Sequence, residues 1–208
     1  HARVDHLQAQ GHLLLLGLPD ATTGALPPQE SVPKARAAAE KALEIDSSVG
    51  EVYFSLGQIK SKDQDWSGAE RAFVRGTRLN PNYPIGCLYY AVYLASLGRH
   101  DEAATEIRRG QELDPLSLPV NAGAAYVLYF AREYDEAIAV CKKTLEMDAA
   151  FPLTQQRMGM AYVQKKMYPE AIAAFQQASD NSNRAPLAIV SLGHAYAQSG
   201  NIVEAHKV

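Results

Sequence analysis

Cysteine is scarce in this sequence, which contains only Cys87 and Cys141 among 208 residues. Their spacing fits no metal-binding or disulfide motif, so we expect both to be small buried apolar side chains. No apolar run reaches the roughly 18 residues that a membrane-spanning helix needs, and "LLLLGL" at 13–18 is far shorter. The chain begins with His1 and shows no secretory signal, which favours a fragment of a longer protein.

An excess of positive charge is also missing, since 20 Lys and Arg face 23 Asp and Glu for a net charge of −3. No strongly basic field is therefore available to attract nucleic acid or an anionic membrane. The sequence contains no Walker loop, G-x-G-x-x-G, G-x-S-x-G, H-R-D or D-F-G motif. His6 and His12 do not have ligand spacing, and no acidic loop has calcium spacing. We expect no enzyme activity, no catalytic residue, no cofactor and no metal site.

What the sequence does contain is a strict periodicity of small side chains. Alanine recurs at Ala35, Ala69, Ala103, Ala137, Ala171 and Ala205. A second column of small residues, at a constant offset before the last five alanines, consists of Gly57, Ala91, Ala125, Gly159 and Gly193. Small residues at fixed helical positions allow neighbouring helices to approach closely. A period of about 34 residues indicates a repeat architecture.

Larger apolar residues flank the small ones at i, i+3 and i+4 offsets, which is the spacing of amphipathic helices. Each period therefore predicts two helices joined by a turn, and Pro81 and Pro115 end the second helix. Carboxylates in the turns at 63–65 and 101–103 are expected to cap the second helix of their units.

The stretches "YFSLGQI…DWSGAERAFVRGTRLNP" and "SLGHAY" resemble the tetratricopeptide repeat, a helix–turn–helix unit of about 34 residues. This resemblance implies an all-α fold, a right-handed α-solenoid (superhelix) of antiparallel helix pairs with about six units, the last truncated. We expect a single array over 1–208. Its units are an atypical first repeat at 1–49 with a loop insertion at 18–29 between helices at 3–17 and 31–45, then 50–83, 84–117, 118–151, 152–185 and a partial repeat at 186–208. Ala149 and Asn183 replace the usual proline, which leaves the local turn shape open.

Longer phrases, such as "DWSGAERAFVRGTRLNPNY" and "YLASLGRHDEAATEIRRGQELDPLSLPVN", resemble a particular group of these repeats. They are similar to the C-terminal repeat region of bacterial CadC-like winged-helix regulators, serine/threonine kinases and adenylate cyclases. The resemblance implies a regulatory repeat array but leaves the attached effector domain open.

In such an array the first helices line a concave face, at positions two, five, nine and twelve of each repeat. An apolar and aromatic groove is expected there, and the residues assigned to it are Phe54, Gln58, Leu88, Tyr89, Val92, Tyr126, Tyr129, Phe130, Gln156, Met160 and His194. Several of these could instead pack inward against neighbouring repeats. Members of the family that bind chaperone tails carry Lys and Asn at positions five and nine. Because Phe54/Gln58, Leu88/Val92 and Ala122/Tyr126 occupy them here, we expect no binding of that kind.

These patterns favour a protein–protein interaction scaffold, the sensory or regulatory C-terminal part of a larger bacterial signalling protein. The expected partner is a protein, a peptide or the chain's own N-terminal domain, with no nucleic acid or membrane bound by this fragment. Two alternatives stay open: the regulatory tail of a DNA-binding regulator or a kinase, and an oligomerisation module that self-associates through its truncated end. The compartment is open between cytoplasm and periplasm.

Overall fold

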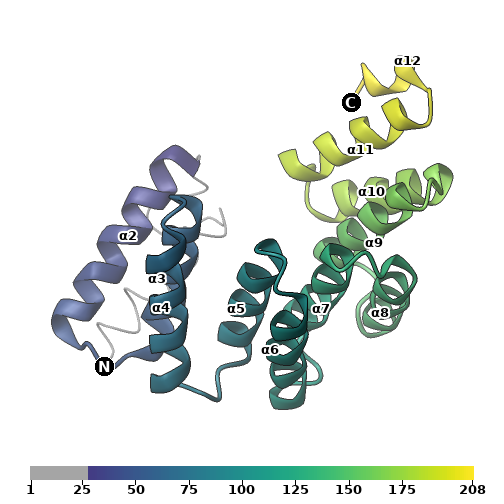
Figure 1. Cartoon of the computed structure of the whole chain (residues 1–208). Helices are drawn as coiled ribbons and strands as arrows, with labels where there is room; N and C mark the ends of the chain where they lie inside the picture. The colour runs from purple at the N-terminus through teal and green to yellow at the C-terminus, as the bar shows by residue number, and fades with distance from the viewer. Residues whose placement is uncertain (1–27) are drawn as a thin grey trace. The chain divides into compact units, whose positions relative to one another are not determined.

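The computed structural model describes residues 28–208, so the helix expected at 3–17 and nearly all of the loop expected at 18–29 lie outside the described residues. The described part contains α-helices and no strand. In chain order (Figure 1) they are α2 (Pro28–Ile45), α3 (Gly50–Lys62), α4 (Trp66–Leu79), α5 (Pro84–Ser96), α6 (His100–Leu113), α7 (Leu118–Phe130), α8 (Tyr134–Met147), α9 (Pro152–Gln164), α10 (Tyr168–Asn181), α11 (Pro186–Gln198) and α12 (Ile202–Ala205).

The helices come in pairs that repeat with the period of the small residues. The first helices, α3, α5, α7, α9 and α11, begin at equal intervals, at Gly50, Pro84, Leu118, Pro152 and Pro186. The second helices, α4, α6, α8, α10 and α12, begin at a constant offset from their partners, at Trp66, His100, Tyr134, Tyr168 and Ile202. The expected all-α class, a solenoid built from helix pairs, is confirmed.

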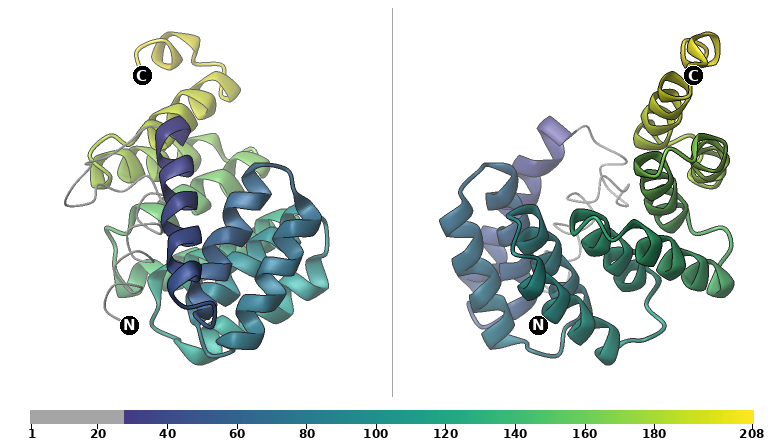
Figure 2. Two further views of the ribbon diagram at one scale, coloured as in Figure 1. Left: turned by 90° about the vertical axis from the view of Figure 1, so that its left-hand side faces the viewer. Right: turned by 45° about the vertical axis from the view of Figure 1, so that its right-hand side comes forward.

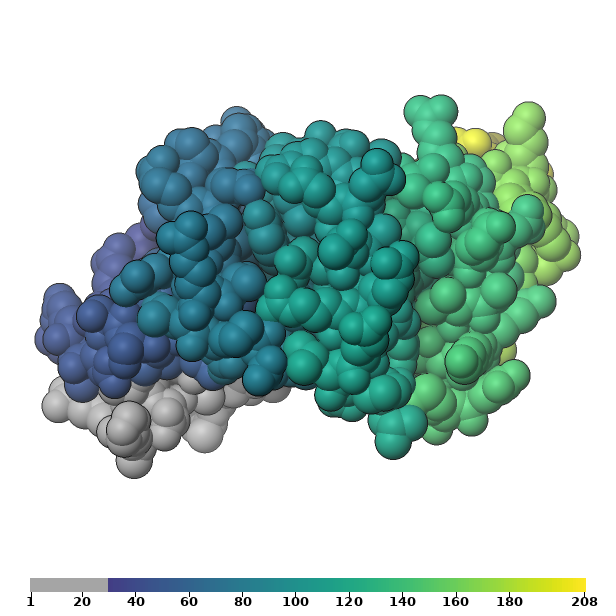
Figure 3. Space-filling model, turned by 60° about the horizontal axis from the view of Figure 1, so that its bottom comes forward, coloured from purple at the N-terminus to yellow at the C-terminus, as the bar shows by residue number. Residues whose placement is uncertain are grey.

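The described residues divide into two compact units, 28–93 and 94–208, with the boundary inside α5. In the first unit α2 packs on α3 and α3 packs on α4 (Figure 2). In the second unit each helix from α6 to α11 packs on the next along the chain, and α12 closes on α11. First helices also contact each other directly, α7 with α9 and α9 with α11. In the space-filling view of Figure 3, side chains of successive second-unit helices abut in chain order.

The small residues lie where helices approach most closely. The recurring alanines Ala69, Ala103, Ala137 and Ala171 are all buried. A Cβ added at Gly159 would lie 2.7 Å from the Phe175 ring, and one at Gly57 would lie 2.7 Å from the Phe73 ring. Gly57 and Gly159 on first helices therefore each make room for an aromatic ring of the second helix in the same pair.

The turn inside each pair adopts a left-handed backbone at one fixed position of the repeat. The residues at this position, Gln64, Gly98, Arg132, Lys166 and Gly200, all have φ between 59° and 83°. Glycine takes this conformation at no steric cost, whereas residues with a Cβ are strained by it. The sequence marks this position only where it is glycine, at 98 and 200.

The turns between pairs are held by side chains that recur with the same period. Asp46, Asn80, Asp114 and Asp148 each accept a hydrogen bond from the backbone N–H two residues later, which is a common way for Asp and Asn to stabilise a turn. The turn before α11 departs from this pattern, because Asn183 and its neighbour Arg184 both have positive φ. Ala149 also replaces the usual proline, yet Asp148 keeps the common turn there, so the absence of proline does not by itself explain the different turn at 183.

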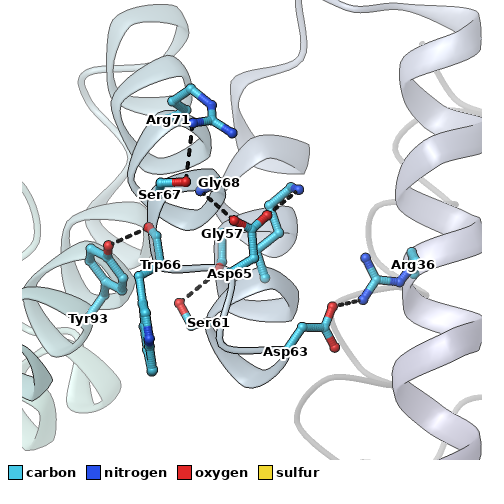
Figure 4. A network of polar contacts seen from close by, with 11 residues as sticks. Arg36, Gly57, Ser61, Asp63, Asp65, Trp66, Ser67, Gly68, Arg71 and Tyr93 are labelled. Atoms are coloured by element: carbon cyan, nitrogen blue, oxygen red, sulfur yellow. Dashed lines mark hydrogen bonds and ion pairs between the residues drawn. The ribbon is translucent and has the colours of Figure 1, made fainter.

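Capping of the second helices follows the sequence prediction at only one of the two turns. Asp65 is the N-cap of α4, where its Oδ1 accepts a hydrogen bond of 2.9 Å from the Gly68 N–H (Figure 4). A hydrogen bond from Lys60, together with the Gly68 bond, holds the pKa of Asp65 below its usual value. The expected cap at 101–103 is wrong, because the N-cap of α6 is Arg99 and Asp101 lies in the first helical turn. In that position Asp101 stabilises the helix only through the interaction of its negative charge with the helix dipole.

Candidate functional site

A pocket of about 320 Å³ opens on the second unit, where the first helices α7, α9 and α11 lie against one another. Its walls come from these three helices, with Phe175 contributed by α10. The lining residues are Tyr126, Tyr129, Gln156, Arg157, Met160, Val163, Gln164, Phe175, Leu187, Val190, Ser191 and His194. The pocket is therefore built by one helix from each of three successive pairs.

Five of the lining residues belong to the groove expected from the sequence. They are Tyr126, Tyr129, Gln156, Met160 and His194. These residues meet because positions five, nine and twelve of a first helix fall on one face. That face is turned toward the neighbouring first helix.

The aromatic side chains of α7 form a connected cluster at one wall. The Tyr126 and Tyr129 rings are stacked with centroids 6.1 Å apart, and the Phe130 ring packs 4.7 Å from Tyr126. Gln164 of α9 donates a hydrogen bond of 3.2 Å to the Tyr129 hydroxyl. Burial raises the pKa of Tyr129, so this phenol stays protonated at neutral pH. Phe130 supports the wall from behind, because it touches both tyrosines and is not itself a lining residue.

Arg157 brings a positive charge into this mostly apolar pocket. Its guanidinium carbon lies over the Tyr126 ring, 3.5 Å from the ring centroid, in a cation–π contact. One terminal nitrogen, Nη1, contacts the Met160 sulfur at 3.6 Å. Its Nε is buried without a hydrogen-bond partner, and no carboxylate among residues 28–208 forms an ion pair with Arg157. Burial lowers the pKa of Arg157, yet an arginine remains charged in proteins.

Two residues of the expected groove are core residues, and for them the prediction is wrong. Phe54 is 1% exposed, because Gly86 leaves space for its ring and Tyr83 packs 5.7 Å from it. Leu88 is also buried. A partner cannot reach either side chain in the folded protein.

The other groove residues of the first unit are partly covered. Gln58, Tyr89 and Val92 are half-buried, and burial raises the pKa of the Tyr89 phenol, which Gln58 contacts by a hydrogen bond. That these three residues belong to a binding surface stays a prediction.

The sequence did not predict three of the lining residues, Arg157, Gln164 and Ser191. Only for Arg157 does the sequence contain a feature that could have indicated its place in the pocket. It is the single Asp, Glu, Lys or Arg in α7, α9 and α11 together. Helices with so few charges are buried or line an apolar surface. Desolvating a lone charge on such a helix costs free energy, so the presence of Arg157 there indicates a functional role. The residue follows position five directly, so it lies at the edge of the predicted face.

Other kinds of site are not found in the part of the chain that the structure describes. No group of three or more His, Cys, Asp and Glu side chains there could hold a metal ion. None of its helices combines the length and apolar character that crossing a membrane requires. Cys87 and Cys141 are both buried.

Comparisons with known proteins agree with this architecture. The tetratricopeptide repeat family matches residues 54–117. Small glutamine-rich tetratricopeptide repeat-containing protein 2 of Mycosarcoma maydis is 26% identical over 85 residues, which are 41% of this chain and 24% of that protein. Hsp70-Hsp90 organizing protein 2 of Arabidopsis thaliana is 28% identical over 103 residues, which are 50% of this chain and 18% of that protein. The matched region thus spans a quarter or less of these relatives.

Among solved structures, a thermophilic TPR protein of Thermus thermophilus superposes with a TM-score of 0.77 at 16% identity. The similarity covers 93% of this chain and 99% of that one, and at this identity it concerns the fold. The family match shows tetratricopeptide repeats at residues 54–117, and helix pairs begin at the same intervals along the rest of the described chain.

Proposed function

We propose that this protein is a non-catalytic interaction scaffold that binds a peptide segment of a partner protein in the pocket between α7, α9 and α11. The observation that supports this proposal is the apolar exposure at the pocket. Leu187 is 62% exposed and Val190 is 67% exposed, and both line it beside the α7 aromatic cluster. Concave surfaces that combine exposed apolar side chains with aromatic anchors are typical of protein interaction sites.

The size of the pocket favours a peptide over a globular surface. A volume of about 320 Å³ is at the lower end of the range for small-ligand sites. It accommodates a few side chains of a peptide laid across the three helices. Exposed wall residues such as His194 leave the entrance open on the α11 side.

The experiment is a selection of peptides from a displayed random library on the immobilised protein, followed by binding measurements with the enriched peptides. Val190→Arg places a bulky charge in the pocket, and we expect it to weaken binding by at least about tenfold. The matched control is Val203→Arg on α12, because Val203 is equally exposed at 66% and does not line the pocket. Equal affinity of both variants, or enrichment of no peptide, would reject the proposal.

We further propose that the array serves as the regulatory part of a larger bacterial signalling protein. The support is the resemblance of its repeat sequences to those of CadC-like regulators, kinases and cyclases. The test is the sequence that precedes His1 in the complete reading frame. A winged-helix, kinase or cyclase domain there supports the proposal, and an unrelated domain contradicts it.

Self-association is a second candidate, which the exposed apolar side chains of α12 favour. Ile202 and Val203 are more than half exposed on this short helix. Light scattering over a range of concentrations tests it. A constant monomer mass would reject self-association without touching the peptide proposal.

A further inference from the structure

The outer face of α4, in the first compact unit, carries a row of three arginines. Arg71, Arg75 and Arg78 are all exposed, and their spacing of four and three residues places them on one side of the helix. Val74 lies among them and is half-buried. No Asp or Glu among residues 28–208 forms an ion pair with any of the three. The arginine row therefore surrounds one apolar side chain with uncompensated positive charge, along about 10 Å of helix.

This positive charge distinguishes α4 from the other second helices. α4 contains three arginines and one glutamate, whereas α6, α8 and α10 each contain more acidic than basic residues. On these three helices the repeat position of Arg78 is occupied by Glu112, Glu146 and Asp180. The repeat fold therefore does not require arginine at this place, and α4 departs from the chain's own pattern in the sign of its charge.

Two of the guanidinium groups are oriented by neighbours that leave their charge uncompensated. Arg71 donates a hydrogen bond of 3.4 Å to the Ser67 hydroxyl (Figure 4). The guanidinium carbon of Arg75 lies 5.9 Å from the centroid of the Tyr53 ring on α3. A hydroxyl or an aromatic face can orient a guanidinium without neutralising it. A carboxylate that pairs with these groups would meet donors that are already partly ordered, which lowers the entropy cost of pairing.

The size and surroundings of the arginine row favour an acidic helix over a larger polyanion. A nucleic acid or a membrane surface would extend beyond α4 and meet a chain of net charge −3, which repels it. A single helix with carboxylates at i, i+4 and i+7 has the same spacing as the arginines, and an apolar residue between the carboxylates would cover Val74. Guanidinium groups pair with carboxylates through two parallel hydrogen bonds.

We propose that the outer face of α4 binds an amphipathic α-helix of a partner protein, which carries Asp or Glu at i, i+4 and i+7 around an apolar residue. This surface is separate from the proposed peptide pocket, which is built by helices of the other compact unit. Exposed ion pairs are individually weak, so three of them together contribute about tenfold in affinity. Salt screens exposed charges, and the contribution therefore falls as the salt concentration rises.

The probe is a fluorescein-labelled peptide, stapled into a helix, with three Glu residues aligned at i, i+4 and i+7 and a Leu between them. Its control has the same composition, with the Glu residues spread around the helix. Fluorescence polarisation with the full chain measures both affinities. We expect the aligned peptide to bind about tenfold more tightly than the spread peptide, and to lose this advantage at high salt. Vesicles of phosphatidylcholine and phosphatidylserine are a second probe, and we expect no binding to them.

Replacing Arg71, Arg75 and Arg78 together by Gln should remove the preference for the aligned peptide. Replacing all three by Glu should transfer the preference to an aligned peptide with Lys in place of Glu. The matched control is Arg108→Gln, an exposed arginine on α6, which should keep the preference for the Glu peptide.

The three positions of the arginine row are exposed, so we expect the variants to fold. Should they fail to fold, the comparison of aligned and spread peptides on the unaltered protein still decides. Equal affinity for both peptides, a preference that survives the loss of the arginines, or binding to the vesicles would overturn the inference. Each of these results leaves the peptide pocket standing, because Val190→Arg tests that pocket separately.

Discussion

The contact between Gly159 and Phe175 predicts that one added methyl group destabilises this protein at residue 159. A Cβ at Gly159 would lie 2.7 Å from Cε1 of Phe175, whereas carbon atoms in contact are about 3.5 Å apart or more. The ring would have to move by roughly 1 Å. Phe175 is 2% exposed, so it has no solvent to move into, and we expect Gly159→Ala to strain the core.

The magnitude follows from two opposing effects. Replacing glycine by alanine inside a helix gains about 1 kcal/mol of intrinsic helix propensity. Forcing an extra methyl into a packed core costs about 1–3 kcal/mol. The net expectation for Gly159→Ala is a loss of about 1 kcal/mol in the free energy of unfolding.

Gly193 provides a matched control in the same protein. It is the eighth residue of α11, as Gly159 is the eighth residue of α9, so the propensity gain is the same for both. Its added Cβ would meet nothing closer than 3.8 Å, the Ala205 carbonyl oxygen. We therefore expect Gly193→Ala to stabilise by about 1 kcal/mol. The difference between the two variants isolates the cost of overpacking, about 1–3 kcal/mol.

Urea unfolding followed by far-UV circular dichroism measures both variants against the unaltered protein. A further variant, Gly159→Ala with Phe175→Leu, tests the cause, because the two changes should be less than additive if the ring is what the methyl meets. Equal stabilisation by Gly159→Ala and Gly193→Ala would refute the reasoning. Strict additivity in the double variant would place the strain elsewhere.

Three further predictions concern turns, caps and burial. Arg132→Gly and Lys166→Gly should each stabilise by about 1 kcal/mol in thermal unfolding, because glycine relieves the positive φ at both positions; a lower Tm would contradict this. Asp65→Ala should lower Tm at neutral pH, and since the pKa of Asp65 is held below 3.8, the difference from the unaltered protein should shrink as pH falls below 3.8; a pH-independent difference would exclude the cap. Cys87 and Cys141 should resist a thiol-reactive disulfide reagent at pH 8 until the protein unfolds, because both are buried and burial raises the pKa of Cys141 to about 12. The contribution of Cys141 to stability is complete below its ordinary pKa of 9.0 and is lost as pH rises toward 12.

The sequence by itself determined the repeat and its spacing. Small residues such as Gly57 and Gly159 have no substitute where two helices and an aromatic ring share one space, so their recurrence reveals the helix pairs directly. The period also placed Tyr126, Met160 and His194 on one face of successive first helices, which is why they meet in one pocket. The period of an α-helix fixes which of its residues share a face, so the sequence alone assigns residues to the faces of each helix.

Only the tertiary structure decided which positions on those faces are accessible. Phe54 and Met160 occupy position five and position nine of their repeats, yet Phe54 is enclosed by Tyr83 and Gly86 while Met160 lines an open pocket. The strained turn at Arg132 and the missing cap at Asp101 were likewise hidden, because neither leaves a consistent residue type behind. Burial depends on the side chains that neighbouring elements contribute, and a repeat pattern does not contain that information.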